Sequence, residues 1–248
     1  MDFLFQLYSA RHTPLQESLK IVADAGYAGV EAVGENFADN GAFKTGLEKH
    51  KLGVASIHFS LAAMKDDMDA CQAIAQQYQC QHIVGPFIEE EERPVSAAQW
   101  QALGKELAGF QAQWARADCT FAWHNHDFEF IKLPDGSMPI QHLFDTAASV
   151  QWEIDVAWIV RAGVDPAIWI DKYLQRISAV HLKDIAPQGV CTDEDGWADL
   201  GEGVVPWQTL MPRLLRSSAA HYIVEHDNPS DLQRFADRSI KAARALSV

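Results

Sequence analysis

The chain has 248 residues, of which 48% are hydrophobic and 22% are charged, and its formal net charge is −14 at pH 7. This composition indicates a globular chain rather than a disordered or collagen-like one, and the length suits a single α/β barrel. A surface this acidic repels phosphate groups, which argues against nucleic-acid and membrane-surface partners. We also expect no membrane span, because the sequence lacks a run of about 18 apolar residues.

The N-terminus and the cysteines favour a cytoplasmic protein. Residues 1–8 have no basic start, and their apolar run is too short for a signal peptide. The four cysteines, Cys71, Cys80, Cys119 and Cys191, form no CxxC pair. Free thiols in a reducing compartment are therefore expected.

Short β-branched or aromatic runs alternate with longer helical patterns along the whole chain. The predicted strands are Phe3–Tyr8, Gly29–Val33, Val54–Phe59, His82–Phe87, Thr120–His126, Val150–Asp155, Ile177–Asp184 and His221–His226. Strands that alternate with helices form parallel pairs with right-handed crossovers. Eight such units predict a single (β/α)8 TIM-barrel domain over residues 1–248. The alternative is an open doubly wound sheet, which usually carries a glycine-rich turn after its first strand; here that turn reads Ser9-Ala10-Arg11-His12.

Capping patterns predict several helix boundaries. Helix starts are expected at Thr13–Gln16, Ser96–Gln99, Asp165-Pro166 and Ser230–Gln233. The first of these matches a capping box with proline at the first helical position. Gly26 and Gly53 lie just before strands, where the residue that follows a helix needs a positive φ.

One long segment, 186–206, lacks periodicity and is rich in Asp, Glu and Gly. Loops of this length inside a compact domain are usually functional or disordered. Because the segment follows the seventh strand, we expect it to overhang the C-terminal face of the barrel, where barrel active sites lie. Trp197, Trp207 and Gly201-Glu202-Gly203 favour a functional loop over a plain acidic one.

Histidines and carboxylates fall at the C-terminal ends of the predicted strands. They are Glu31, His58, His124, His126, Glu153, Asp155, His181, Glu225 and His226, joined by Lys183. An unpaired charge is costly inside a barrel, so side chains that converge on one rim need a compensating partner. A divalent cation meets that need most simply.

Strand alternation narrows the choice of ligands. If the polar faces point inward, Asp155, His181 and Glu225 meet at the barrel mouth from three consecutive strands. Two carboxylates and one imidazole suit Mn²⁺, Mg²⁺, Co²⁺ or Zn²⁺. The alternative is that each acid pairs with a lysine or an arginine.

Five segments form a recognisable set: Trp123-His124-Asn125-His126-Asp127-Phe128-Glu129-Phe130, Glu153-Ile154-Asp155, His181-Leu182-Lys183-Asp184, Gly201-Glu202-Gly203 and Tyr222-Ile223-Val224-Glu225. With these segments the chain resembles the family of xylose-isomerase-like TIM-barrel sugar isomerases and epimerases. The resemblance spans essentially the whole chain. Its first and third segments are the most specific.

The resemblance implies a divalent metal, most often Mn²⁺, held by a glutamate, an aspartate, a histidine and a glutamate from strands five to eight. Asp155, His181 and Glu225 match the last three positions. The first position departs from the family pattern, because His124 stands where many members carry a glutamate. Three alternatives remain open there: His124 supplies a nitrogen ligand, a water takes the position, or Glu129 reaches the metal. A symmetric epimerisation that uses two glutamate bases is in doubt.

The chemistry implied is proton transfer next to the carbonyl of a keto-sugar. A chelated metal stabilises an ene-diolate as a Lewis acid, and a carboxylate removes the neighbouring proton. We expect Glu225 to be the base and Lys183 to stabilise the oxyanion or shuttle a proton. The candidate substrate-binding residues are Glu31, His58, His126, Glu129 and Trp158; Trp158, Trp197 and Trp207 also offer faces on which a sugar can stack.

The expected substrate is a neutral carbohydrate, because Glu202 places a negative charge where a phosphate would need a basic cluster. A metal-dependent isomerase or epimerase is the leading hypothesis. A lyase or dehydratase acting on a keto-sugar, keto-glycoside or keto-inositol is the runner-up. A DNA-repair endonuclease is disfavoured by the acidic charge, and a non-catalytic sugar-binding protein is the remaining alternative. A homo-oligomer is possible, although no sequence feature indicates one.

Overall fold

Eight parallel strands close into a barrel in the computed structural model, which describes residues 1–247. They are β1 (Leu4–Gln6), β2 (Gly29–Val33), β3 (Gly53–His58), β4 (His82–Gly85), β5 (Thr120–His124), β6 (Gln151–Asp155), β7 (Ile177–Leu182) and β10 (His221–Val224). Each strand pairs with the next along the chain, and β10 closes the barrel against β1. The predicted (β/α)8 fold is confirmed. The assignment of residues 1–248 to one domain stays a prediction, and residue 248 lies outside the described residues.

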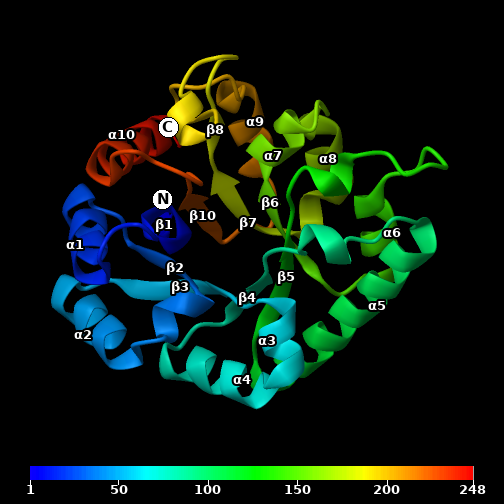
Figure 1. Ribbon diagram of the computed structural model, residues 1–248, viewed down its shortest axis with the longest axis horizontal. Coiled ribbons are helices and arrows are strands. Elements are labelled where there is room, and N and C mark those ends of the chain that lie inside the picture. Colours follow the sequence, from blue (N-terminus) through cyan, green and yellow to red (C-terminus); the bar gives the residue numbers. More distant parts are fainter. Residues whose placement is uncertain (248) are drawn as a thin grey trace.

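Helices surround the barrel on its outer side (Figure 1). They are α1 (Leu15–Ala25), α2 (Asn40–His50), α3 (Leu61–Asp66), α4 (Met68–Gln77), α5 (Ala97–Trp114), α6 (Pro139–Thr146), α7 (Val156–Arg161), α8 (Pro166–Tyr173), α9 (Trp207–Leu214) and α10 (Leu232–Leu246). In α10, Leu232, Phe235 and Ile240 are buried, as expected for a helix with one apolar face. No helix within residues 1–247 combines the length and apolarity needed to cross a bilayer.

Several strands end earlier than predicted. The first stops at Gln6, because the Gln6 side chain accepts the backbone N–H of Tyr8 and caps the 3₁₀ helix Leu7–Ala10. The fifth stops at His124 rather than His126. Just after the first strand the backbone N–H of Tyr8 donates to Gln6, and just after the fifth the backbone N–H of His126 donates to the Glu129 carboxylate; a hydrophobic pattern does not reveal such bonds.

The predicted helix starts are right at two positions and wrong at two. Ser96 and Asp165 cap α5 and α8 as expected. The capping box at Thr13–Gln16 is wrong, because α1 begins at Leu15 without a side-chain cap. The box at Ser230–Gln233 is displaced by one residue, because Asp231 caps α10.

Of the two predicted helix ends, one is right and one is wrong. Gly26 ends α1 with a φ of 88°, as expected. Gly53 does not end a helix; it is the first residue of β3, and Lys51 adopts the left-handed conformation that closes α2. A lysine at a position that favours glycine conceals the boundary from a sequence pattern.

The barrel interior changes from apolar to polar along its axis. Leu4, Ala179 and Ile223 form a buried apolar cluster inside the barrel. Two residues further along these strands, the inward positions are occupied by Gln6, His181 and Glu225, which are also buried. Because alternate residues of a strand share a face, the apolar layer supports a polar layer at the C-terminal ends of the strands.

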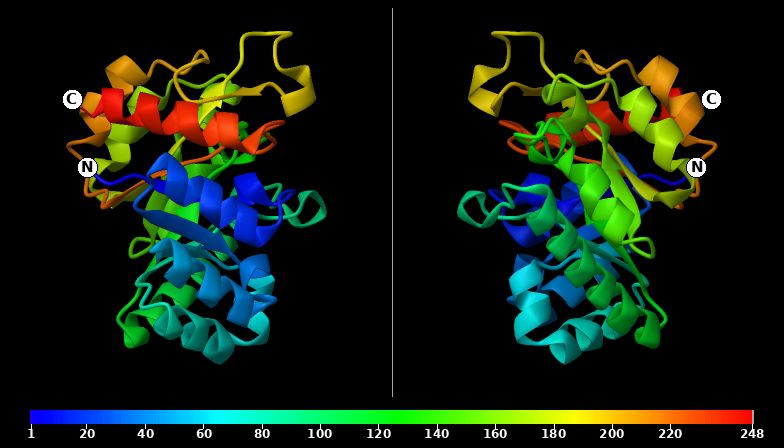
Figure 2. Two further views of the ribbon diagram at one scale, coloured as in Figure 1. Left: turned by 90° about the vertical axis from the view of Figure 1, so that its left-hand side faces the viewer. Right: turned by 90° about the vertical axis from the view of Figure 1, so that its right-hand side faces the viewer.

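The segment after β7 forms a small antiparallel hairpin of β8 (Asp184–Ile185) and β9 (Trp197–Ala198). It projects from the body of the molecule, in yellow in Figure 2. The Asp184 carboxylate accepts the backbone N–H groups of Gly201 and Val205, which ties the loop back to the barrel. Asp184 therefore belongs to this hairpin and not to the barrel strand, where the sequence pattern placed it.

Two glycines of α5 provide a matched test of the packing between α5 and α6. A Cβ at Gly104 would lie 2.0 Å from Thr146 Oγ1 and 2.6 Å from the Leu143 carbonyl oxygen, whereas a Cβ at the exposed Gly109 meets nothing within 4 Å. We expect Gly104→Ala to lower the free energy of unfolding by about 1–3 kcal/mol through overpacking. Gly109→Ala should raise it by about 0.5–1 kcal/mol through helix propensity. Chemical denaturation measures both changes, and equal effects at the two sites would contradict the packing described.

Candidate active site

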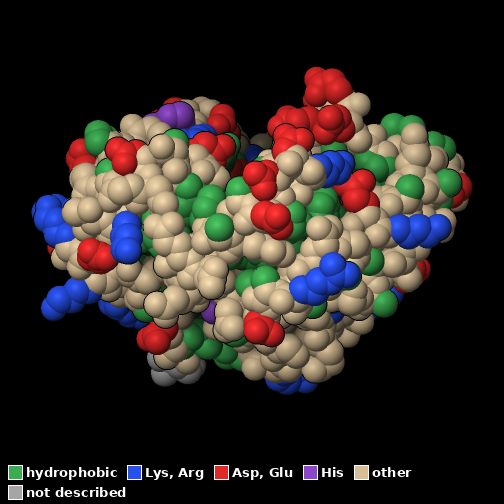
Figure 3. Space-filling view, turned by 90° about the horizontal axis from the view of Figure 1, so that it is seen from below, with side chains coloured by type: hydrophobic (Ala, Val, Ile, Leu, Met, Phe, Trp, Pro, Cys, Tyr) green, Lys and Arg blue, Asp and Glu red, His purple; other side chains and the backbone are tan. Residues whose placement is uncertain are grey.

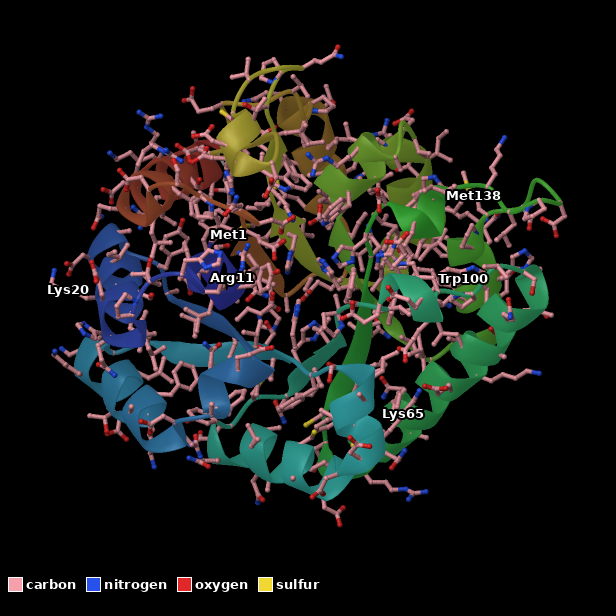
Figure 4. All side chains as sticks on the ribbon, in the orientation of Figure 1. Met1, Arg11, Lys20, Lys65, Trp100 and Met138 are labelled. Atoms are coloured by element: carbon pink, nitrogen blue, oxygen red, sulfur yellow. The ribbon has the colours of Figure 1, made fainter. Side chains whose placement is uncertain are left out.

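A cavity of about 790 Å³ opens at the C-terminal ends of the barrel strands. His58, His124, His126, Glu225 and Asp227 line it, together with residues of the loops that follow the strands. Arg11 also lines this cavity, and Figure 4 shows Arg11 inside the ring of helices, whereas Lys20 lies at its outer edge. On the face shown in Figure 3, Lys and Arg side chains are scattered among Asp and Glu side chains.

Four of the predicted residues meet beside this cavity and form what we call the outer cluster: His124, Asp155, His181 and Glu225. Each offers one nitrogen or oxygen atom, and these atoms all lie within 4.8 Å of one another. All four residues are buried. They come from the ends of β5, β6 and β7 and from the residue that follows β10, which are neighbours in the barrel. The convergence expected from strand alternation is therefore present.

Asn125 positions Asp155 from the neighbouring strand. The Asn125 Oδ1 accepts the backbone N–H of Asp155, at 3.0 Å, and the indole N–H of Trp152. Its Nδ2 donates to the Asp155 carbonyl, also at 3.0 Å. The side chain thus continues the strand pairing beyond the last residue of β5 and fixes where Asp155 lies.

Only one of the two oxygens of the Asp155 carboxylate accepts a hydrogen bond. Its Oδ1 accepts the backbone N–H of Trp158 at the start of α7. Its Oδ2 is buried and has no hydrogen-bond partner anywhere in residues 1–247. Burial raises the pKa of Asp155 to about 6, against the opposing charge of Lys183. A buried carboxylate oxygen without a donor is expensive, which suggests that a ligand completes it.

Lys183 is completely buried among carboxylates. Its ammonium group lies 2.5 Å from Asp227 Oδ1, 3.2 Å from Glu225 Oε2 and 3.7 Å from Asp155 Oδ2. Although burial alone would lower the pKa of Lys183, the charges of Asp227 and Glu225 raise it above its usual value. The lysine is therefore a fixed positive charge, also flanked by the rings of Trp158 and Trp197.

His181 lies between two sets of carboxylates. Its Nδ1–H donates to Glu225 Oε2 at 2.9 Å, and its Nε2–H faces Glu31 Oε1 at 2.7 Å. Burial would lower the pKa of His181, but the carboxylates of Glu225 and Glu153 raise it well above its usual range. The same His181 and Lys183 hold the pKa of Glu225 well below its usual range, against the effect of burial.

A second group, the inner cluster, shares His181 and adds Glu31, His58 and Glu153. Of these four residues only His58 lines the cavity, whereas Glu31, Glu153 and His181 are fully buried. Glu153 lies two residues before Asp155 on the same face of β6, so this cluster is deeper in the barrel.

The remaining predicted binding residues take two different positions. His126 and Trp158 line the cavity with their rings 5.1 Å apart, and Phe87 packs against His126. Glu129 is fully buried beside the cavity wall rather than on it. Its carboxylate accepts the indole N–H of Trp123 and the backbone N–H of His126, so Glu129 braces the end of β5.

Of the loop tryptophans, Trp197 lines the cavity, whereas Trp207 is buried at the start of α9 away from the cavity lining. The sequence interpretation missed Asp227 as a partner of Lys183 and Asn125 as the residue that positions Asp155. Asp227 lies two residues after Glu225, and this spacing could have indicated it. Nothing in the sequence indicates that the Asn125 side chain pairs with the backbone of Asp155.

Burial raises the pKa of Glu129 to about 8, from a usual value of 4.5. An acid that holds its proton more tightly when folded loses stability as pH rises from its unfolded to its folded pKa. We therefore expect the free energy of unfolding of the wild type, relative to Glu129→Gln, to fall between about pH 4.5 and 8 and to level off above. Urea denaturation across this range measures the difference. A difference that is constant with pH would contradict the burial of this carboxyl group.

Comparison with known proteins places the chain in a family. The family model of the xylose isomerase-like TIM barrel matches residues 19–246. No curated protein shows significant sequence similarity to the chain. A solved sugar phosphate isomerase/epimerase from Parabacteroides distasonis is 18% identical with a TM-score of 0.77, and the match covers 100% of this chain and 94% of that one.

Two further solved structures share the fold. The probable 3-DHS dehydratase AsbF from Bacillus anthracis is 14% identical with a TM-score of 0.75, over 98% of this chain and 99% of that one. The IOLI protein, solved with a bound zinc atom, is 13% identical with a TM-score of 0.75, over 100% of this chain and 97% of that one. Identities this low show the fold alone. The match to the family model, however, covers most of the sequence, and the chain belongs to the xylose isomerase-like TIM-barrel family.

Proposed function

We propose that this protein is a divalent-metal-dependent isomerase or epimerase of keto-sugars, and that it works by removing a proton next to a carbonyl. The observation that carries the proposal is the outer cluster: two carboxylates and two imidazoles converge beside a buried lysine at the rim of a cavity. Structural neighbours named as a sugar phosphate isomerase/epimerase and a dehydratase support the reaction class.

The outer cluster fits a divalent metal. Its donor set contains oxygen and nitrogen but no thiolate, which suits Mn²⁺, our first choice, and also Mg²⁺, Co²⁺ or Zn²⁺. The Asp155 Oδ2 atom has no hydrogen-bond partner in residues 1–247, and its nearest cation, Lys183 Nζ, is 3.7 Å away, so this oxygen is free to bind an ion. His124, Asp155, His181 and Glu225 would hold the ion, and His124 takes the position that is a glutamate in many members of the family. When bound, the metal would polarise the substrate carbonyl as a Lewis acid.

Glu225 is the proposed base. It lines the cavity and is held by His181 on one side and Lys183 on the other. These two partners keep its carboxylate ionised and fix the oxygen that they contact. Both partners contact Oε2, which would also be the oxygen that faces the ion, so Oε1 is the oxygen that can accept a proton from a substrate carbon.

Lys183 supplies a permanent positive charge behind the base. Because its ammonium group contacts Asp227 and Glu225 and is fully buried, it cannot exchange its proton as readily as an exposed lysine. Its proposed role is therefore electrostatic, favouring negative charge as it develops on the substrate oxygen, as in other preorganised sites.

The cavity wall suits a carbohydrate. His58 and His126 present polar atoms, and Trp158 presents an aromatic face to the same space. Three arginines also line the cavity, but Arg11, Arg93 and Arg161 already donate to backbone carbonyls. Acidic residues outnumber these arginines in the cavity lining, and this charge balance favours a neutral sugar over a sugar phosphate.

The residue at the end of the fifth strand, His124, distinguishes isomerisation from epimerisation as the proposed reaction. An epimerase that works on both faces of its substrate needs a base on each side, and the strand-five position that would supply the second carboxylate holds His124. Burial lowers the pKa of His124 to about 4, so the imidazole is neutral. One carboxylate base suits transfer of a proton between adjacent carbons, and isomerisation is therefore favoured over epimerisation.

A lyase or dehydratase is the second candidate, on a specific observation. Glu225 and Lys183 lie side by side, 3.2 Å apart, on one wall of the site. A single base next to a fixed cation also suits removal of a proton followed by loss of a leaving group from the neighbouring carbon. Analysis of the products by NMR separates the two reactions: an isomer retains the atoms of the substrate, whereas elimination releases water or an alcohol.

The proton-transfer step is testable in D₂O. We expect the wild type with Mn²⁺ to exchange deuterium into a keto-sugar at the carbon next to the carbonyl. Glu225→Gln should slow this exchange by about 10²–10⁴-fold, because a positioned base contributes that much. Glu35→Gln, which changes another acid at the cavity, is the matched control and should exchange normally. Equal rates for Glu225→Gln and the wild type would refute the assignment of the base.

Metal retention tests the outer cluster separately from turnover. We expect Asp155→Ala and Glu225→Ala to lose both activity and the metal of the outer cluster while remaining folded, as judged by circular dichroism. Metal analysis after gel filtration measures the loss. If either variant kept full turnover, the proposed ligand set would be wrong.

A further inference from the structure

Four atoms of the inner cluster lie close together inside the barrel, all within 4.8 Å of one another. They are the Nε2 atoms of His58 and His181 and the Oε1 atoms of Glu31 and Glu153. His58 Nε2 lies 3.1 Å from the Glu31 oxygen and 2.7 Å from the Glu153 oxygen. His181 Nε2 lies 2.7 Å and 3.0 Å from the same two oxygens.

Hydrogen bonding alone does not explain why two imidazole nitrogens and two carboxylate oxygens lie together. Each ring nitrogen carries at most one proton but faces two carboxylate oxygens, so every contact is shared. The two carboxylates are also brought together around the same donors although like charges repel. A side-chain pair that served only as a hydrogen-bonded brace would need one nitrogen and one oxygen, not two of each.

The four nitrogen–oxygen separations are close to those between ligands of a tetrahedral metal site. Zinc ligands at about 2.0–2.1 Å from the ion are about 3.3 Å from one another in a tetrahedron. The four nitrogen–oxygen separations, from 2.7 to 3.1 Å, are slightly shorter, so a small outward movement of each side chain accommodates an ion. Two imidazole nitrogens and two carboxylate oxygens are ligands that Zn²⁺ and Co²⁺ accept.

Neighbouring polar groups hold the carboxylate ligands in place. Gln6 Nε2 donates to Glu31 Oε1 at 2.7 Å, and the Ser56 hydroxyl donates to the other oxygen of Glu31. Such outer contacts orient the ligands of established metal sites. The second oxygen of Glu153 is buried and finds no hydrogen-bond partner within the described part of the chain.

We propose that Glu31, His58, Glu153 and His181 form a second divalent-cation site of the Zn²⁺ or Co²⁺ type, deeper in the barrel than the outer cluster. His181 then joins the two sites, with Nε2 toward the inner ion and Nδ1 toward the outer cluster. When both ions are bound, both N–H protons of His181 leave to solvent. Glu31 and His58 are ligands in this arrangement, instead of the contacts to sugar hydroxyls that the sequence suggested.

The inner site does not depend on the proposed reaction, but it fixes one of the groups that the reaction needs. An ion on Nε2 holds the His181 ring in one orientation and leaves Nδ1 directed at Glu225. Loss of the inner ion is therefore expected to weaken metal binding by the outer cluster as well, without removing any of its other ligands.

Titration of the metal-free protein with Co²⁺ tests the proposal, with the visible absorption of the bound ion and metal analysis as readouts. We expect two equivalents per chain for the wild type and for His82→Gln, a control that changes a buried histidine 3.9 Å from Glu153. Glu31→Gln should lose one equivalent, with the loss of the tetrahedral Co²⁺ spectrum. His58→Gln should do the same, and it serves if the first variant does not fold.

The outcomes separate this inference from the proposed function. If the wild type binds one equivalent and neither Glu31→Gln nor His58→Gln changes it, the inner cluster is only hydrogen bonded and the inference is wrong. If Asp155→Ala keeps both equivalents, the inner site stands and the ligand role of Asp155 in the outer cluster fails. If the wild type binds one equivalent that Glu31→Gln removes and Asp155→Ala leaves intact, the inner site holds the only ion and the proposed function is refuted.

Discussion

The structure depends on how the barrel accommodates carboxylates that are removed from water. Glu31, Glu153, Asp155 and Glu225 are buried in the polar end of its interior. Within the described residues, Lys183 is the only buried lysine or arginine. Burying several like charges is unfavourable unless they are paired and hydrogen bonded. The histidines share this task, and the unpartnered oxygens of Asp155 and Glu153 show where compensation by protein groups is incomplete.

The architecture explains why such a strained set of charges is concentrated in one place. Parallel strands deliver their C-terminal ends to one rim, and alternation directs every second side chain inward. The apolar layer of Leu4, Ala179 and Ile223 closes the barrel on the other side of the polar layer. Short polar links then adjust individual groups: Asn125 sets Asp155, and Asp184 ties the loop that carries Trp197. The clusters are thus produced by strand geometry and refined by side chains that contact backbone.

Much of the fold and the centre of the site could be predicted from the sequence, because both follow from the period of two along a strand. That period identified the strands and placed Asp155, His181 and Glu225 on one face. It could not show that the first and fifth strands would end at Gln6 and His124, since side-chain hydrogen bonds to the backbone lie just beyond both strands. Pairings between distant strands, such as that of His58 on β3 with Glu153 on β6, depend on closure of the barrel. Residues that are individually ordinary become a cluster only after that closure.

Anomalous diffraction from crystals grown with Mn²⁺ tests most directly whether the outer cluster holds a cation. We expect a strong anomalous peak at the rim of the barrel, within about 2.0–2.3 Å of ligand atoms from His124, Asp155, His181 and Glu225. Diffraction data without a peak there, with the four side chains still bonded only to one another and to Lys183, would contradict the claim that these buried carboxylates are arranged to hold a cation.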